Sequence, residues 1–379
     1  MKKRFAIVAP NYHPRTCGVG DHSMRIAAEL RRRQHDVMVF TRAPAQPDPE
    51  EPDVPVLGVD ETWPTRISSA IAERIATGGF TDVILQYAPR MWDASRFGSA
   101  ALPLFVSRMR RLALPIALVI HEPCPPWSMR PDLAASAALL RAQLVLVIRA
   151  ARRHFITTES RRALLASIFS AAGAPPPRVL RVGPNATPVA PAWNPDGHRI
   201  GLFSTLAVGR RFDVVIDAFD EVSRTFPDAE LVLLGDFGSP TSPAARAVSD
   251  RIARSPNAKR IQVTGRLSLG EIARIIATLN VYFFAQNTGA NTRSSTLPIA
   301  LGSGVPVVAI RGPETDALFA DGENVLFADD LDGPSFARAA LRIFADRALS
   351  DRLSAGGRRL HTDELSWPRV VDSLLAALD

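Results

Sequence analysis

The chain has 379 residues, 46% of them hydrophobic and 22% charged, a composition typical of a globular protein with two domains. Its net charge of +7 fits an anionic partner, but the arginines are scattered and no basic stripe interleaved with aromatic residues occurs, which argues against nucleic acid. The two cysteines, Cys17 and Cys124, exclude a disulfide framework, and no cysteine or histidine spacing indicates a metal site.

The first residues, MKKRFAIVAP, predict a strand, because their apolar run is too short for a signal-peptide core and stops at Pro10. No stretch reaches the roughly 18 uninterrupted apolar residues of a membrane span. We therefore expect a cytoplasmic protein, attached at most peripherally at the inner face of the membrane. Arg108, Arg110 and Arg111 are the expected contact with anionic lipid, and a solvated helix face explains the same cluster.

Short apolar runs alternate with helical patterns through the first half of the chain. Between the first two runs, Met24, Ala27, Ala28 and Leu30 recur at helical spacing and predict a helix over 21–33. This βαβα order predicts a parallel sheet covered by helices on both faces. The predicted strands are 5–10, 36–40, 82–88, 115–121 and 154–158.

Residues 183–197 contain four prolines and interrupt the pattern, which is typical of an interdomain linker. After them the alternation restarts, so the fold class is α/β, with two doubly wound, Rossmann-like parallel-sheet domains facing across a cleft. The second set of strands is predicted at 199–205, 229–235, 260–265, 281–285, 305–310 and 324–328, followed by helices at 332–347 and 366–378. The predicted domains are 1–188 and 198–362, joined by a linker at 189–197, with a C-terminal helix at 363–379 that packs back toward the first domain.

Two loops of the first domain follow predicted strands, where ligands of open α/β sheets bind. In the loop 12–23, Gly18 and Gly20 permit close backbone approach to a ligand ahead of a helix N-terminus, and a plain tight turn explains them equally. In the segment 119–127, His121 and Glu122 end a strand and are suited to orienting a substrate or exchanging a proton. A strand-end histidine bonded to a backbone carbonyl is the alternative.

Two segments of the second domain carry anion-binding side chains. Arg210 and Arg211 follow its first strand, where a guanidinium group neutralises a diphosphate or marks a solvated helix start. The stretch 291–297, NTRSSTL, places Arg293 and three hydroxyl side chains before an apolar helix. A single hydroxyl suffices to cap a helix, so this surplus of donors indicates an anion cradle as well.

The sequence resembles the GT-B-fold glycosyltransferases of family 4, which are retaining, nucleotide-sugar-dependent enzymes. The most specific match is the segment 297–332, which contains a helix, a Gly-x-Pro-Val-Val strand, an acidic loop and DGENVLF. Weaker matches are CGVGDHSMRIAAEL, VIHEP, VGPNATP and LVLLGDFG, and together they span almost the whole chain. The resemblance implies that the first domain binds the acceptor and the second binds the nucleotide sugar.

The resemblance also implies roles for individual residues. His121 approaches the transferred sugar, and Arg210 or Arg211 replaces the family's diphosphate-binding lysine. The implied donor-binding residues are Gly18, Val19, Gly20, Gly235, Asp236, Arg266, Arg293, Ser294, Ser295, Thr296 and Leu297. The implied acceptor-binding residues are His13, Asp21, Trp92, Glu122 and Trp127. No metal and no cofactor is implied beyond the donor, a UDP-sugar or GDP-sugar.

The sequence departs from the family pattern at two carboxylates. The family carries two glutamates separated by seven residues, and Asn291 and Ile299 occupy their places here. TRSSTL resembles a divergent branch with an arginine in this loop, so Arg293 is expected to supply charge. We expect a retaining transferase acting on a carbohydrate, lipid-linked or small-molecule acceptor. The alternatives are a GT-B-fold nucleotide-sugar epimerase and a non-catalytic nucleotide-sugar-binding scaffold.

Overall fold

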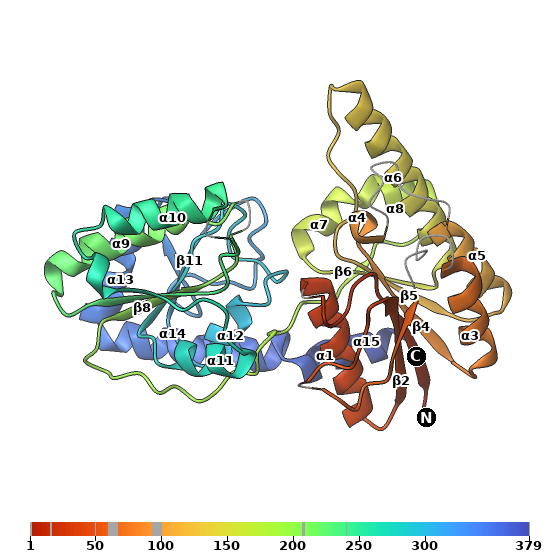
Figure 1. The fold of residues 1–379 in the computed structure, drawn as a ribbon, viewed down its shortest axis with the longest axis horizontal. Coiled ribbons are helices and arrows are strands. Elements are labelled where there is room, and N and C mark those ends of the chain that lie inside the picture. Colours follow the sequence, from red (N-terminus) through yellow and green to blue (C-terminus); the bar gives the residue numbers. More distant parts are fainter. Residues whose placement is uncertain are drawn as a thin grey trace. The chain divides into compact units, whose positions relative to one another are not determined.

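The computed structural model describes residues 2–15, 17–49, 51–59, 67–92, 101–206, 209–239 and 241–378. They form two units, each described by itself: Met1–Arg181 with Trp367–Asp379, and Val182–Ser366 (Figure 1). The predicted linker 189–197 packs on the second unit, since the Ala192 N–H donates to the Ala277 carbonyl at 2.8 Å and the Asn280 side chain donates to the Asn194 carbonyl at 2.6 Å. The division therefore lies earlier than the proline-rich pattern predicted.

The first unit contains a seven-stranded parallel sheet in the order β3-β2-β1-β4-β5-β6-β7. Its strands are β1 Arg4–Val8, β2 Asp36–Arg42, β3 Val56–Val59, β4 Asp82–Tyr87, β5 Ile116–Ile120, β6 Arg153–Ile156 and β7 Arg178–Val179. Five coincide with predicted apolar runs. The sequence missed the edge strands β3 and β7, because the first is only partly buried and the second has two residues.

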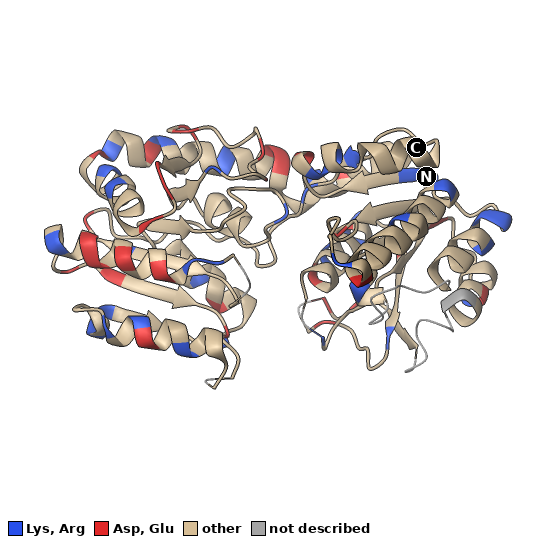
Figure 2. Ribbon diagram, turned by 90° about the horizontal axis from the view of Figure 1, so that it is seen from above, with Lys and Arg blue, Asp and Glu red and all other residues tan. Residues whose placement is uncertain are grey.

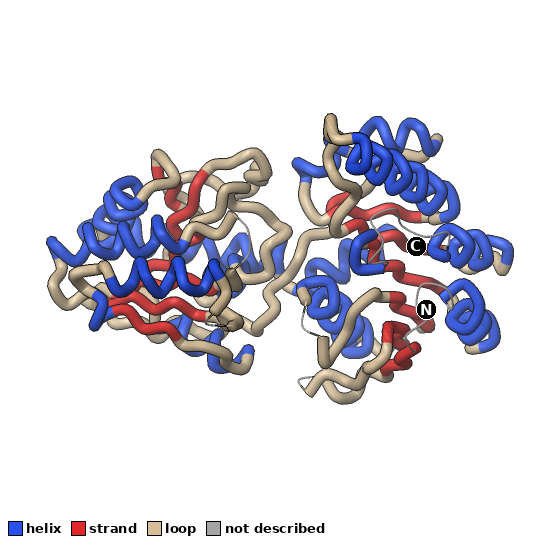
Figure 3. The backbone as a smooth tube through the Cα atoms, turned by 45° about the horizontal axis from the view of Figure 1, so that its top comes forward, coloured by secondary structure: helices blue, strands red, loops and turns tan. Residues whose placement is uncertain are grey.

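Helices cover both faces of this sheet, as the side view in Figure 3 shows. Strand β1 explains why, since Phe5 and Ile7 point into one apolar layer and Ala6 and Val8 into the other. The first layer is closed by α1 Gly18–Arg32 and α15 Trp367–Leu378, and the second by α3 Ala72–Thr77, α5 Ala101–Arg111, α6 Pro131–Ala150 and α8 Ala166–Ala172. The short elements are η1 Ile67–Ile71, α4 Pro89–Trp92 and α7 Glu159–Leu164.

The second unit contains a six-stranded parallel sheet in the order β10-β9-β8-β11-β12-β13. All six strands lie within predicted runs: β8 Arg199–Phe203, β9 Glu230–Leu234, β10 Ile261–Val263, β11 Val281–Phe284, β12 Val307–Ile310 and β13 Leu326–Ala328. One face is covered by α9 Phe212–Thr225, α10 Pro243–Ala253 and α13 Gly333–Ala345, the other by α11 Leu269–Ala277 and α12 Leu297–Gly302, while α14 Arg347–Leu360 contributes to both. The remaining turns are η2 Ala258–Arg260 and η3 His361–Leu365.

Each sheet has one point where the strand order reverses direction. It lies between β1 and β4 in the first unit and between β8 and β11 in the second. The loops that leave the carboxyl ends of such a strand pair diverge to opposite faces, and ligands of open α/β sheets bind in the space this leaves. The loops after β1, β4, β8 and β11 are therefore the places where functional side chains are expected.

Two glycines of the second unit provide a matched test of its packing. A Cβ added at Gly356 in α14 would overlap the carbonyl oxygen of Glu323, whereas one at Gly270 in α11 has Arg274 at 4.0 Å as its nearest neighbour. We expect Gly356→Ala to lower the free energy of unfolding by about 1–3 kcal/mol, because the overlap involves rigid backbone. Gly270→Ala is expected to raise it by up to about 1 kcal/mol. Urea denaturation checks both, and equal effects would contradict the described contact of α14.

Candidate functional site

Arg210 lies at the reversal point of the second sheet. It follows β8, and a backbone bridge to Gln286 ties its loop to the loop after β11. In the part of the chain that the structure describes, the guanidinium group has no carboxylate partner, and its Nη1 is buried without a hydrogen bond. The pKa of Arg210 is lowered to about 10, mainly by burial, with the nearby Tyr282 opposing the shift and the positive charge of Arg293 adding to it. Arg210 is therefore a charged, partly buried group that an anion would stabilise.

Arg211 has a different environment, although it is the next residue. Its Nε and Nη2 donate to Asp213 at 2.9 and 2.7 Å, and this pairing lowers the pKa of the Asp213 carboxyl group. Both side chains are exposed at the start of α9. The prediction left both arginines open as diphosphate ligands. The structure corrects it for Arg211, which is a solvated helix start.

The loop between β11 and α12 is held by buried polar side chains. Asn291 is 2% exposed and donates from Nδ2 to the Gly289 carbonyl at 2.8 Å, while its Oδ1 accepts from the Arg293 N–H at 3.2 Å. Thr292 donates from its backbone and its hydroxyl group to the Asp316 carboxylate at 2.6 and 2.8 Å. These bonds fix the backbone on either side of Arg293. Asn291, which replaces a family glutamate, is thus a structural residue of this loop.

Two carboxylates near Arg293 were missed by the sequence analysis. Glu314 lies 3.5 Å from Arg293 Nη2, and the buried Asp316 binds Thr292. Both come from the loop after β12, where the letters PETD follow Gly312. The signal was present as an acidic loop, but the pairing of that loop with residues 291–293 is visible only in three dimensions. A carboxylate therefore does lie beside this site.

The hydroxyl groups in front of α12 do not cap it, contrary to the prediction. Thr296 occupies the N-cap position without a side-chain bond to the helix, and its Oγ1 lies 3.1 Å from Ser294 Oγ. Among the described residues, the backbone N–H groups of Ser295, Thr296 and Leu297 have no protein acceptor. The stretch keeps its donors available beside Arg293, which is the arrangement that binds an anion.

Three further donor-site predictions fall on neighbouring strands. Gly235 ends β9 with φ +136°, and an added Cβ would overlap the Ser204 carbonyl oxygen, so only glycine fits there. Asp236 is exposed and accepts from the Gly238 N–H at 2.8 Å. Arg266 is exposed and follows the edge strand β10, two strands away from β8. Gly235 thus shapes the edge of the site. Of these three residues, Arg266 lies farthest from Arg210 along the sheet.

The glycines after β1 lie inside α1, which begins three residues before the predicted start of its helix. Cys17 is the N-cap, and its Sγ accepts from the Gly20 N–H at 3.2 Å. A Cβ at Gly20 would lie 3.2 Å from the Asn11 carbonyl oxygen, whereas Gly18 is exposed with open space around it. The Val19 side chain is buried in the unit. Packing within the protein therefore explains Gly20 and leaves Gly18 free for a ligand.

His121 lies in a buried cluster at the carboxyl ends of β4 and β5. Its Nε2 lies 2.6 Å from Gln86 Oε1, and its ring packs edge-on against His22 with centroids 4.8 Å apart. The His22 ring in turn contacts Trp367 of α15 at 5.5 Å. Burial lowers the pKa of His22 to about 4. Burial, together with the nearby His22 and Arg161, lowers the pKa of His121 well below its usual value. Both rings are neutral at pH 7, and because the single N–H of His121 donates to Gln86 Oε1, its Nδ1 is left as a hydrogen-bond acceptor.

The predicted acceptor residues separate into three environments. Trp92 is 3% exposed and donates from Nε1 to the Gln86 carbonyl at 2.7 Å, so it is a core residue and not the acceptor ligand that the resemblance implied. His13 lies 3.6 Å from Asp48, in contact with the loop after β2. Asp21 lies in the first turn of α1, and Glu122 is exposed. Trp127 is 64% exposed, with the Arg141 guanidinium group 4.2 Å from its ring centroid.

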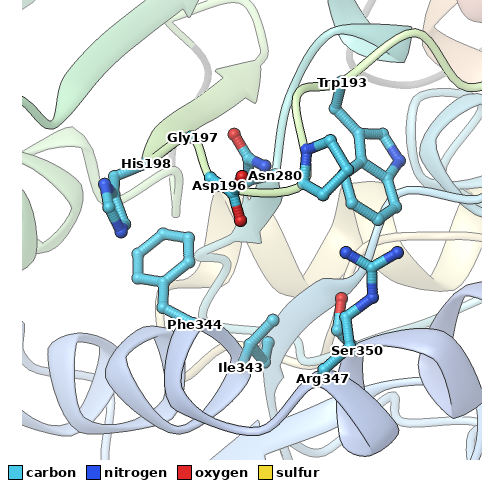
Figure 4. A pocket seen from close by; sticks show the side chains of 10 residues that line it. Trp193, Asp196, Gly197, His198, Asn280, Ile343, Phe344, Arg347 and Ser350 are labelled. Atoms are coloured by element: carbon cyan, nitrogen blue, oxygen red, sulfur yellow. The ribbon is translucent and has the colours of Figure 1, made fainter.

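Hollows of about 280 and 360 Å³ lie at the opposite, amino-terminal edge of the second sheet. Figure 4 shows the first, where the His198 and Phe344 rings lie together and Arg347 lies below the Trp193 ring. They are lined by residues that precede β8 and β11 together with residues of α13, α14 and the start of β9, and neither contains Arg210 or Arg293. Among the described residues, no three His, Cys, Asp or Glu side chains come together as a metal-binding group.

The architecture is that of the GT-B glycosyltransferases. The chain is similar over 99% of its length to Anabaena HepE (Alr3699) in complex with UDP, with 99% of that chain covered, a TM-score of 0.73 and 13% identity. It is similar over 99% of its length to sucrose-phosphate synthase from Thermosynechococcus elongatus, with 98% of that chain covered, a TM-score of 0.72 and 15% identity. A glycosyltransferase from Rickettsia africae gives a TM-score of 0.74 at 12% identity, with 99% and 97% of the two chains covered. At these identities the likeness establishes the fold.

The family match is confined to the second unit. Residues 197–346 match the family model described as Glycosyl transferases group 1. They include Arg210, Arg293 and the loops after β8, β11 and β12. No curated protein matches the chain. The second unit thus matches a glycosyltransferase family, while the narrower family 4 and retention of configuration stay predictions.

The neutral histidine pair predicts that stability falls in acid. Because burial lowers the pKa of His22 to about 4, the unfolded chain binds more protons than the folded one between about pH 6.5 and 4. We expect the free energy of unfolding to fall by about 2 kcal/mol between pH 7.5 and 5 on account of His22. His22→Phe, which keeps the ring contacts and leaves no nitrogen unpaired, is expected to remove that part of the loss. Urea denaturation at both pH values checks this, and an unchanged pH dependence would contradict it.

Proposed function

We propose that the protein is a retaining, metal-independent glycosyltransferase that moves a hexosyl group from a nucleotide diphosphate sugar to an acceptor hydroxyl group. The observation that carries the proposal is the partly buried Arg210 guanidinium group, which has no carboxylate partner among the described residues and lies at the reversal point of the second sheet. Arg293 and the unpaired N–H groups of residues 295–297 lie in the adjoining loop. Two cations and a set of backbone donors match the two phosphates of such a donor.

The comparison with HepE supports UDP as the nucleotide of the proposed donor. HepE of Anabaena has been observed with UDP, with UDP and glucose, and with UDP-glucose. We propose a UDP-sugar as the donor, with a GDP-sugar as the alternative, and no further cofactor. Asn291 and Ile299 replace the family's two glutamates, so recognition of the ribose falls to other groups of the second unit.

The chemical step requires stabilisation of the departing diphosphate. Negative charge develops on the phosphate oxygen as the glycosidic bond breaks, and Arg210, Arg293 and the loop N–H groups are preorganised to stabilise it. The acceptor hydroxyl group attacks from the face that the diphosphate leaves, and the leaving phosphate takes its proton. Glu314 holds Arg293 at 3.5 Å and limits its movement.

The first unit is proposed to bind the acceptor, a carbohydrate, a lipid-linked sugar or a small molecule. His121 is the group proposed to approach the transferred sugar, with Nδ1 of the neutral imidazole accepting a hydrogen bond from a sugar hydroxyl group, since its Nε2–H donates to Gln86 Oε1. Gly18 has the open space that a close backbone contact requires. Asp21 and Glu122 remain proposed acceptor ligands, and Trp127 has an exposed ring suited to stacking.

Nucleotide binding tests the phosphate site directly. Calorimetric titration with UDP, GDP, ADP and dTDP is expected to give binding of one nucleotide, weakened about 10- to 100-fold in Arg210→Ala and in Arg293→Ala, since each removes charge-assisted hydrogen bonds. Arg211→Ala is the matched control, because its guanidinium group is already paired with Asp213, and is expected to change affinity less than about twofold. Absence of binding to all four nucleotides would favour the non-catalytic scaffold.

A turnover measurement distinguishes a glycosyltransferase from a nucleotide-sugar epimerase. We expect the wild-type protein to release nucleotide from the donor only when an acceptor is supplied, and Arg210→Ala to lower kcat at least about tenfold, because leaving-group stabilisation acts in the transition state. Coupled nucleotide release with and without acceptor measures this. Isomerisation of the donor sugar without an acceptor would instead identify a nucleotide-sugar epimerase.

A further inference from the structure

The helix α6 is apolar on the side that faces away from the core. It has 20 residues with a mean hydropathy of 1.6 in its most apolar window, so by length and composition it is suited to crossing a membrane. Its inner residues Leu140, Leu144 and Val147 are buried in the first unit, which packs it as a core helix. Leu139 and Leu146, on the outer side, are 50% and 51% exposed. The helix is therefore amphipathic only weakly and presents apolar side chains outward.

The segment that leads into α6 extends this apolar area. After β5 the chain runs outward from the sheet and returns as α6, so that the first turn of α6 lies at a protruding tip (Figure 1). Trp127 and Met129 precede that turn, and the Met129 side chain is fully exposed. Leu104 and Leu112 are exposed on and just after the neighbouring helix α5. Six of the eight large hydrophobic side chains exposed in the described chain thus lie on these two helices and the tip, which isolated surface leucines do not explain.

Arginines outnumber carboxylates in the segments that carry these apolar side chains. Lysine and arginine occur over both units (Figure 2), but residues 101–114 and 122–150 contain six arginines and only two carboxylates. One of the two carboxylates, Asp132, is paired with Arg130 at 3.2 Å. Arg141 lies over the Trp127 ring and Arg110 and Arg111 lie at the end of α5. An exposed tryptophan, aliphatic side chains and an excess of arginines over carboxylates form the combination that anionic lipid headgroups attract.

We propose that this surface, formed by the tip 125–130 and the outer sides of α5 and α6, docks on an anionic lipid bilayer. Trp127 and Met129 enter the boundary between headgroups and acyl chains, and the arginines contact lipid phosphates while their apolar stems lie along the surface. A second copy of the chain is the less suitable occupant, because a two-fold contact through this surface would bring its arginines against one another. The docking does not depend on the proposed transfer activity, so its test measures binding alone.

The test is co-sedimentation of the full chain with vesicles of phosphatidylcholine, with and without 30 mol% phosphatidylglycerol (about a third anionic lipid). We expect binding to the anionic vesicles, weakened by added salt. Trp127→Ser with Met129→Ser is expected to weaken it at least about tenfold, since both apolar side chains leave the lipid, and Arg110→Ser with Arg111→Ser by about fivefold for each arginine. Leu164→Ser is the matched control, since Leu164 is 71% exposed on α7 outside the surface.

Two outcomes would overturn the proposal. The first is equal sedimentation of wild type and the Trp127→Ser, Met129→Ser variant while circular dichroism shows both folded. The second is an absence of vesicle binding together with a dimer in analytical ultracentrifugation that the same variant dissociates, which would assign the surface to a second copy. Because the substituted side chains are exposed, loss of folding is not expected to obscure either result.

Discussion

The structure of the candidate site depends on one electrostatic constraint, the partial burial of the Arg210 guanidinium group without a carboxylate partner in the described part of the chain. Removing a guanidinium group from water is costly, and proteins usually place a carboxylate beside it. Here the neighbouring cation is Arg293, whose own partner Glu314 holds it in place. The surrounding loop is tied down by Asn291, Thr292 and buried Asp316, so the two cations do not relax apart. A bound anion satisfies this arrangement, and the proposed function follows from it.

Most of the sheet structure was predictable because parallel strands are buried on both faces. Eleven apolar runs were identified, and each overlaps a strand of the structure. Two edge strands were missed because neither gives an apolar run in the sequence: β3 is partly exposed and β7 has only two residues. The proline-rich segment was misassigned because prolines mark a chain without regular structure and do not show what it packs on. Residues 182–197 form backbone hydrogen bonds with the rest of the second unit, and the amino-acid composition of the segment does not predict these bonds.

The sequence predicted which loops form the candidate site, but it did not predict the role of each residue in those loops. Strand ends located His121, Arg210 and Arg293, since all follow apolar runs. The choice between Arg210 and Arg211 required knowing that Asp213 binds the second. The burial of Trp92 depends on its bond to the Gln86 carbonyl, six residues earlier, which its spacing does not reveal. Ser294 and Thr296 pair with each other, a local choice that helix-capping rules do not anticipate.

The return of α15 to the first unit makes the second unit an insertion within the first. Trp367, Val370 and Leu374 complete the apolar layer beside α1, and Arg33 at the C-terminal end of α1 donates to the Pro368 carbonyl at 2.6 Å. During synthesis the ribosome therefore makes the whole of the second unit before the first has its last helix. The second unit can finish folding while the first, although begun earlier, still exposes the α1 face of its sheet. The nascent chain thus completes its domains in the reverse of their order of appearance, and the exposed face is where a chaperone would act.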